Sequence, residues 1–147
     1  MVAMTRLPTP LARFKVYPHP PQKWRFECLV WRTAAEMTEY ATRVWSHPAT
    51  NYNAICLSLA TSEITKSRSR KLGEILFTTH HLTHAIIAHE LIHAASHHLQ
   101  IVCGRDAVII SACGESHETE ETVAHGVSNM VAQASVALRA AGIEPHD

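Results

Sequence analysis

The sequence predicts an α+β domain, and three observations lead to this fold class. Short stretches in which apolar and polar residues alternate indicate strands, whereas longer stretches with an apolar repeat of three to four residues indicate helices. The chain has 147 residues, close to the size of one domain, and 46% of them are hydrophobic, which is enough for a core. No internal repeat or interior linker interrupts the order strand, helix, strand, strand, helix, helix.

The chain begins with a proline-rich segment. Residues 1–23 contain five of the seven prolines, so we expect an extended arm there rather than an independent domain. Residues 24–147 then form the single folded domain. The stretch KWRFECLVW (23–31) alternates aromatic or apolar residues with polar ones, which predicts the first strand.

A capped helix and a second strand follow. Thr33 and Glu36 have the spacing of a capping box, which predicts a helix through AAEMTEYATRVW that ends before Pro48. YNAICLSLAT (52–61) is a second expected strand, and SEITKSRSRKLG (62–73) is expected to be a basic, solvated loop.

The last elements are a strand and two long helices. GEILFTT (73–79) predicts a third strand, and it leads into the helical stretch HLTHAIIAHELIHAASHHL (81–99). A final helix is expected from about Glu118 to Ala141, because Gly142 and Pro145 end the pattern. Between these helices the short stretch AVIIS could be a strand or a buried loop.

Composition excludes several classes of function. The formal net charge is zero, which argues against a protein that binds nucleic acid by broad electrostatic attraction. No apolar stretch is long enough for a membrane span, and the first residues lack the apolar core of a secretory signal, so we expect a cytoplasmic protein. The four cysteines show no C-x-x-C spacing and are expected to be reduced thiols, as is usual in the cytosol.

Histidine is the anomaly in this composition, and it points to a metal. Seven of the twelve histidines lie between His80 and His98, and among them is the pattern His-Glu-x-x-His at His89, Glu90 and His93. Side chains four residues apart share one face of a helix, so the two imidazoles can take adjacent corners of a tetrahedral zinc site. Glu90 is then placed to accept a proton from a water on the metal, as the general base of peptide hydrolysis.

A catalytic zinc ion needs a third protein ligand, and the final helix offers one. Counted at about 100 degrees per residue, Glu120 lies in the middle of an apolar stripe, whereas Glu121 lies to its side. A carboxylate there needs a partner, so we expect Glu120 to be the third ligand. Glu121 and His117 remain alternatives. The apolar stripe expected for this helix consists of Val123, Ala124, Val127, Val131, Ala134 and Leu138.

With these residues in view, the chain resembles a known family. The stretches GEILFTTHHLTHAIIAHELIHAASH and ETEETVAHGVSNMVAQ resemble small gluzincin-type metallopeptidases, especially the ImmA/IrrE-like group. The resemblance implies a zincin-like fold, a short and mostly antiparallel sheet packed on the His-Glu-x-x-His helix and a C-terminal ligand helix. It implies one zinc ion per chain, bound by His89, His93 and Glu120, with Glu90 as the base. It also implies that the GEILF strand pairs with an extended substrate. The motif HELIHA resembles SprT-like zinc proteases as well, which use a third histidine.

Two classes of function follow. The favoured one is a zinc-dependent endopeptidase that acts on a protein or peptide substrate. The alternative is a catalytically silent, metal-binding regulatory protein, which would have no need of the base Glu90. The residue that stabilises the oxyanion is open among Tyr52, Arg105, His117 and His125.

Overall fold

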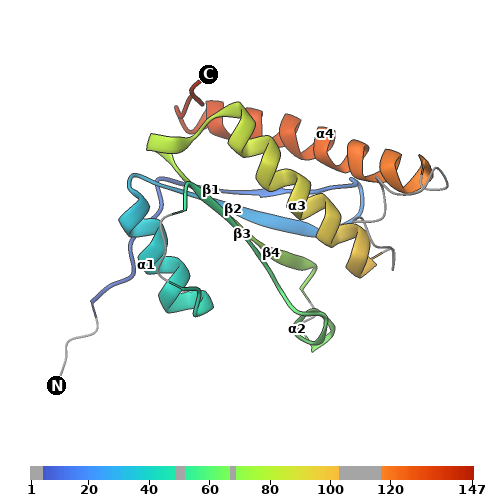
Figure 1. Ribbon diagram of the computed structural model, residues 1–147, viewed down its shortest axis with the longest axis horizontal. Helices are drawn as coiled ribbons and strands as arrows, with labels where there is room; N and C mark the ends of the chain where they lie inside the picture. Colours follow the sequence, from blue (N-terminus) through green and yellow to red (C-terminus); the bar gives the residue numbers. More distant parts are fainter. Residues whose placement is uncertain (1–4, 49–51, 67–68, 103–116) are drawn as a thin grey trace.

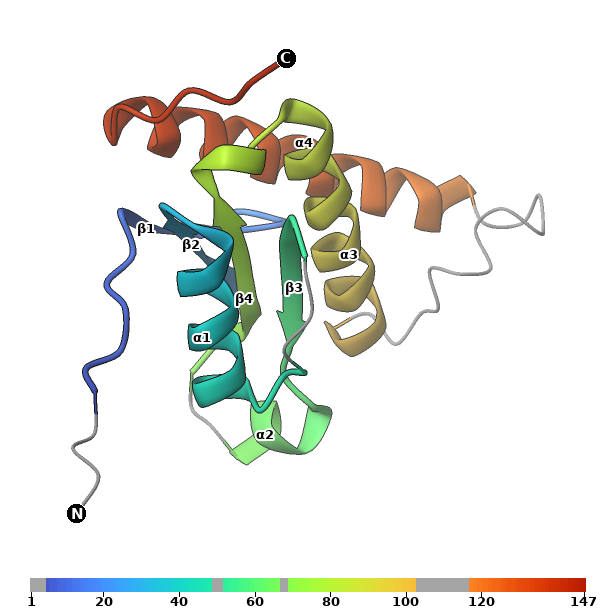
Figure 2. The same ribbon diagram turned by 60° about the vertical axis from the view of Figure 1, so that its left-hand side comes forward.

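The computed structural model describes residues 5–48, 52–66, 69–102 and 117–147, and within them a sheet lies between layers of helices (Figures 1 and 2). The α+β class is confirmed. In chain order the elements are β1 (Ala12–Val16), β2 (Arg25–Trp31), α1 (Ala34–Trp45), β3 (Ala54–Ser58), α2 (Thr61–Lys66), β4 (Lys71–Thr78), the 3-10 turn η1 (Thr79–His81), α3 (His84–Val102) and α4 (His117–Ala140).

The sheet is mixed, and its strand order is β1-β2-β4-β3. Both outer pairings, β1 with β2 and β3 with β4, are antiparallel, whereas the central pairing of β2 with β4 is parallel. The expected mostly antiparallel sheet is therefore correct for two of these three pairings. The strand that contains GEILF is β4, which lies inside the sheet and is buried from Leu72 to Thr78.

The proline-rich start is not a separate arm, and here the sequence-based prediction needs correction. Residues 12–16 form the edge strand β1, and the segment that follows is bound to α4. The backbone N–H of Tyr17 donates to Oε1 of Gln133 at 2.7 Å, and Nε2 of Gln133 donates back to the Tyr17 carbonyl at 2.9 Å. Asn129 donates to the Pro18 carbonyl at 2.8 Å. Prolines flank β1 rather than interrupt it, so they leave its ladder intact.

Two more local predictions can be compared with the structure. The capped helix is confirmed as α1, because the hydroxyl of Thr33 accepts a hydrogen bond from the Glu36 N–H at 3.2 Å and the helix ends at Trp45. The basic loop expected over 62–73 is wrong in part, since α2 and the first residues of β4 occupy most of it.

Helices cover both faces of the sheet (Figure 2). Helix α1 packs against β2 and β4 on one face, whereas α3 lies over β3 and α4 lies over β1 on the other. Gly73 allows β3 to come close to β4, because a Cβ atom at that position would collide with the Leu57 carbonyl oxygen. None of the helices in the described part of the chain is long and apolar enough to cross a membrane.

A buried carboxylate fastens α1 to the sheet. Glu74 on β4 accepts three hydrogen bonds of 2.7 Å, from the Tyr40 hydroxyl, from Nε1 of Trp45 and from Nζ of Lys71. Burial would raise the pKa of Glu74, but the hydrogen bonds from Lys71, Tyr40 and Trp45 outweigh it and hold the pKa below its usual value. Glu74 is therefore ionised at neutral pH and satisfies three donors at once.

Replacement of Glu74 by alanine should destabilise the fold by about 3–5 kcal/mol, because it leaves the Tyr40 and Trp45 donors without their partner. It also leaves Lys71 with Glu27 as its remaining carboxylate. The measurement is urea unfolding at neutral pH. Glu39→Ala is the matched control, since the Glu39–Arg43 pair is exposed and should contribute about 0.5 kcal/mol or less. Equal losses in the two variants would contradict the structural role of Glu74.

Candidate metal centre and its groove

Helix α3 presents one apolar face to the sheet and one polar face to solvent. The helix begins at His84, and the Thr83 hydroxyl caps it by accepting from the Ile86 N–H at 3.1 Å. Its buried apolar residues are Ile87, Leu91, Ala94, Ala95 and Leu99. The helix is nevertheless not buried all round, because Ile92 is 49% exposed and both His89 and His93 are exposed.

The two imidazoles of the motif face one another. Nε2 of His89 and Nε2 of His93 are 3.2 Å apart. Zinc–nitrogen bonds of about 2.0–2.1 Å at a tetrahedral angle put two ligand nitrogens about 3.3–3.4 Å apart. The spacing of the two side chains therefore fits a shared zinc ion with little adjustment.

Glu90 lies next to this pair but points to the interior. Only 8% of the residue is exposed, and its carboxylate accepts a hydrogen bond from the backbone N–H of Cys56 on β3. Burial raises the pKa of Glu90, and His93, His89 and the Cys56 hydrogen bond offset part of that rise. A carboxylate with a raised pKa is a more effective proton acceptor near neutral pH than an exposed one.

Two of the motif residues, His89 and Glu90, lie where two cavities meet, and His93 lines the larger of them. One, of about 530 Å³, and the other, of about 450 Å³, both include His89, Glu90, Tyr52 and Ala54 in their walls. Together they form a groove between α3 and β3, which we call the α3–β3 groove. The remaining wall of the larger cavity consists of His47, Ile55, Cys56, Ser58, His93, Ser96, His97 and Gln100.

The strand beside this groove is not the one expected from the sequence. β4, which contains GEILF, has β2 on one side and β3 on the other, so it has no open edge for a substrate. β3 is the edge strand, and it contributes Ala54, Cys56 and Ser58 to the groove. The error arose because β3 precedes β4 in the chain yet lies outside it in the sheet.

Glu120 is not next to the histidine pair in the structure. Among the described residues, no group of three or more histidine, cysteine, aspartate or glutamate side chains could hold a metal ion. Glu120 is exposed, and the first fully buried position along the described side chains of α4 is Gly126. Met130, Ala134 and Leu138 continue this buried row, whereas Ala124 is exposed.

The expected apolar stripe of α4 was therefore partly misplaced. Gly126 has no side chain and added nothing to the apolar pattern, yet it lies in the helix contact, where a Cβ would approach Ala95 at 3.6 Å. Glu120 precedes Gly126 by six residues, so it lies about 9 Å from that contact along the axis of α4, toward the start of that helix.

The other third-ligand and oxyanion candidates differ in position. Tyr52 lines both cavities and is 39% exposed. His125 is exposed on α4 and pairs with Glu121 at 3.4 Å. Arg105, the AVIIS stretch, Cys103 and Cys113 lie outside the described residues, and so does the side chain of His117. Of the four oxyanion candidates, Tyr52 is the one that the structure places at the groove.

His97 is a further residue of the groove that was not among the site residues expected from the sequence. It is half-buried in the wall of the larger cavity, where its ring lies beside the Leu59 backbone and meets Phe26 edge-on at 6.1 Å. Its Nε2 atom is buried and has no hydrogen-bond partner among the described residues. Burial lowers the pKa of His97, although the bond to Leu59 works against that change. The spacing of four residues from His93 was the available signal, because it puts both residues on one face.

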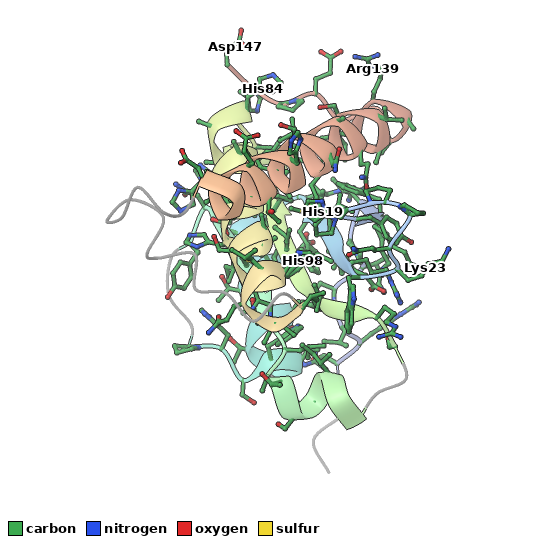
Figure 3. The ribbon with its side chains drawn as sticks, turned by 90° about the vertical axis from the view of Figure 1, so that its right-hand side faces the viewer. His19, Lys23, His84, His98, Arg139 and Asp147 are labelled. Atoms are coloured by element: carbon green, nitrogen blue, oxygen red, sulfur yellow. The ribbon has the colours of Figure 1, made fainter. Side chains whose placement is uncertain are left out.

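The remaining histidines of α3 lie apart from the groove. His84 is exposed at the helix start, and His80 and His81 are exposed in η1, as expected for a strand-to-helix junction. His98 faces the other way: it is 2% exposed, and its ring lies 5.2 Å from that of His19 (Figure 3). Its Nε2 atom has no hydrogen-bond partner among the described residues.

No family model, curated protein or solved structure matches this chain. The function is therefore argued from the site itself.

Buried His98 should make the protein sensitive to acid. Burial, with His19 and His97 nearby, lowers the pKa of His98 from 6.5 to about 4. As the pH falls, the unfolded state therefore takes up the proton first. The contribution of His98 to the free energy of unfolding is fully present above pH 6.5 and is lost between pH 6.5 and 4. At about 1.4 kcal/mol per pH unit, the free energy of unfolding falls by roughly 3 kcal/mol over this range.

Urea unfolding at pH 7, 5.5 and 4 tests this expectation. His98→Leu should lose much less stability across this range, whereas the exposed-site control His84→Ala should behave like the wild type. An identical pH dependence in wild type and His98→Leu would rule out His98 as the source.

Proposed function

We propose that this protein is a zinc-dependent endopeptidase in which His89 and His93 hold the metal and Glu90 is the general base. The observation that carries the proposal is the 3.2 Å spacing of the two Nε2 atoms, beside a buried carboxylate in an open groove. The resemblance to small gluzincin-type metallopeptidases agrees with this assignment. The free thiols of Cys28 and Cys56 suit a reducing compartment such as the cytoplasm.

Each residue has a distinct task in the proposed reaction. Zinc, when bound, supplies a Lewis acid that activates water and polarises the substrate carbonyl. Glu90 takes a proton from the attacking water and gives it to the leaving amine. The Cys56 N–H keeps the Glu90 carboxylate in place between these two transfers. The Tyr52 hydroxyl is our candidate for stabilising the oxyanion, because it belongs to both cavities.

The substrate is proposed to be an extended segment of protein that pairs with the open edge of β3. This assignment replaces the GEILF strand, which has neighbours on both sides. Strand addition of this kind takes affinity from backbone hydrogen bonds and needs an unpaired edge next to the reacting groups. β3 meets both conditions.

The chain should bind about one zinc ion, and His89→Ala or His93→Ala should abolish binding, because a single imidazole gives no chelate. The measurement is metal content after dialysis, together with the rise in melting temperature on addition of zinc. His84→Ala is the matched control, since His84 is exposed at the start of the same helix. Zinc content that is unchanged in both motif variants would contradict the metal site.

The same assay examines the third ligand. The sequence-based proposal that Glu120 completes the site requires the first turn of α4 to approach α3 when zinc binds. It predicts a much larger loss of zinc affinity in Glu120→Ala than in the neighbouring control Glu121→Ala. Equal effects in the two variants would remove Glu120 from the ligand set while leaving the histidine pair in place.

Glu90→Gln separates the peptidase from the silent metal-binding protein. The amide keeps the shape of the side chain but cannot accept the proton, so we expect zinc and fold to be retained while proteolysis falls by about a hundredfold or more. Cleavage is measured by mass spectrometry of a digested peptide library. If the variant cut as fast as the wild type, Glu90 would not be the base. If the wild type bound zinc but cut nothing, the regulatory alternative would be favoured.

A further inference from the structure

The two ends of the α3–β3 groove differ in chemistry. The cavity toward the start of α3 has Asn53, Ala85 and Ile86 in its wall and not in that of the other cavity, and Ala85 and Ile86 give this end its apolar surface. The cavity toward the end of α3 has Ser58, Ser96 and Gln100 in its wall, which bring hydroxyl and amide groups. His89 and Glu90 lie between these ends, in the walls of both cavities.

The backbone of β3 fixes how an extended peptide can lie along the groove. The Leu59 N–H donates to the Leu72 carbonyl at 2.8 Å, so it points into the sheet. The Cys56 N–H instead reaches Glu90, so it points out of the sheet. Because backbone direction alternates along a strand paired on one side, Ala54 and Ser58 also turn their backbone groups to the open edge.

This alternation sets a register relative to the reacting groups. Cys56 is opposite Glu90, and Ala54 and Ser58 lie about 7 Å to either side along the strand. A peptide that pairs with Ala54 and Ser58 therefore has its reacting bond near Cys56. Two side chains of the peptide that are two residues apart, one on each side of that bond, share one face and then enter the apolar end and the polar end.

The walls of the two ends discriminate between side chains by different means. At the apolar end, a charged or amide side chain would lose water against the hydrocarbon of Ala85 and Ile86, with Asn53 as the amide at that end. At the polar end, Ser58 and Gln100 are exposed and can exchange their bonds to water for bonds to a ligand. His97 adds ring surface to this wall, and its Nε2 atom is buried without a hydrogen-bond partner among the described residues.

We propose that the groove selects an extended peptide with a small apolar side chain at the Ala85–Ile86 end and a hydroxyl or amide side chain at the Ser58–Ser96–Gln100 end, on opposite sides of the scissile bond. This inference rests on the proposed peptidase function and adds a substrate class to it. The apolar preference should be tenfold or more, as in other hydrophobic pockets. The polar preference rests on neutral hydrogen bonds and should be smaller, roughly two- to tenfold.

Cleavage of a synthetic peptide library by the zinc-loaded protein tests the proposal, with the cut sites determined by mass spectrometry. Ala85→Asp places a carboxylate at the apolar end, and the exposed second residue of a helix tolerates aspartate well. This variant should change the preference at that end from small apolar residues to lysine or arginine. Ala132→Asp is the matched control, because Ala132 is exposed on α4 and lies outside both cavities.

The outcomes separate this inference from the function on which it rests. Cuts with no preference, or the same preference in Ala85→Asp and wild type, would overturn the two-ended groove and leave the peptidase standing. If the wild type cuts nothing, the peptidase fails, and zinc-loaded Glu90→Gln is then used to capture peptides from the same library. Captured peptides with the apolar and polar pattern would support the groove assignment, whereas capture without that pattern, or no capture, would overturn it.

Discussion

The hydrogen bond from the Cys56 backbone to the Glu90 carboxylate is the interaction on which the site depends. A carboxylate that loses water on burial is costly unless hydrogen bonds or opposite charges replace that water. Helix α3 buries Ile87 and Leu91 against the sheet, and this orientation forces Glu90 inward as well. The Cys56 N–H is available to it because β3 is an edge strand, whose alternate backbone groups have no partner strand. The edge strand β3 therefore supplies the backbone donor that the buried Glu90 carboxylate needs.

The opposite face of the sheet contributes to the site through the same strands. Glu74 ties α1 to β4 through the hydrogen bonds from Tyr40 and Trp45, and among the described strands β4 is the one that pairs with β3. The position of β3 beside α3 is therefore determined from both faces: by α1 through β4, and by α3 through Cys56. His97 adds a third tie, because it joins α3 to the backbone just after β3. Such a rigid frame suits a site in which a proton acceptor must stay close to two imidazoles.

Local features were predictable from the sequence, whereas features that depend on distant pairing were not. The cap at Thr33 and the meeting of His89 with His93 follow from spacing within one helix, and both agree with the structure. Strand order depends on contacts between segments far apart in the chain, so the edge was assigned to the wrong strand. The position of Glu120 was misjudged for a related reason: Gly126 marks the contact between α3 and α4, but a glycine leaves no trace in an apolar pattern.

The arrangement of the motif favours catalysis over a purely structural metal site. A structural zinc site is closed by four protein ligands, and it gains nothing from a carboxylate that is not a ligand. In this chain the imidazoles are exposed to an open groove, and the carboxylate next to them is held back by the backbone of β3. Burial raises its pKa toward the range in which it can both take and return a proton. The exposed imidazoles, the buried carboxylate and an edge strand of the described sheet all border one groove, and the proposed peptide hydrolysis would use all three.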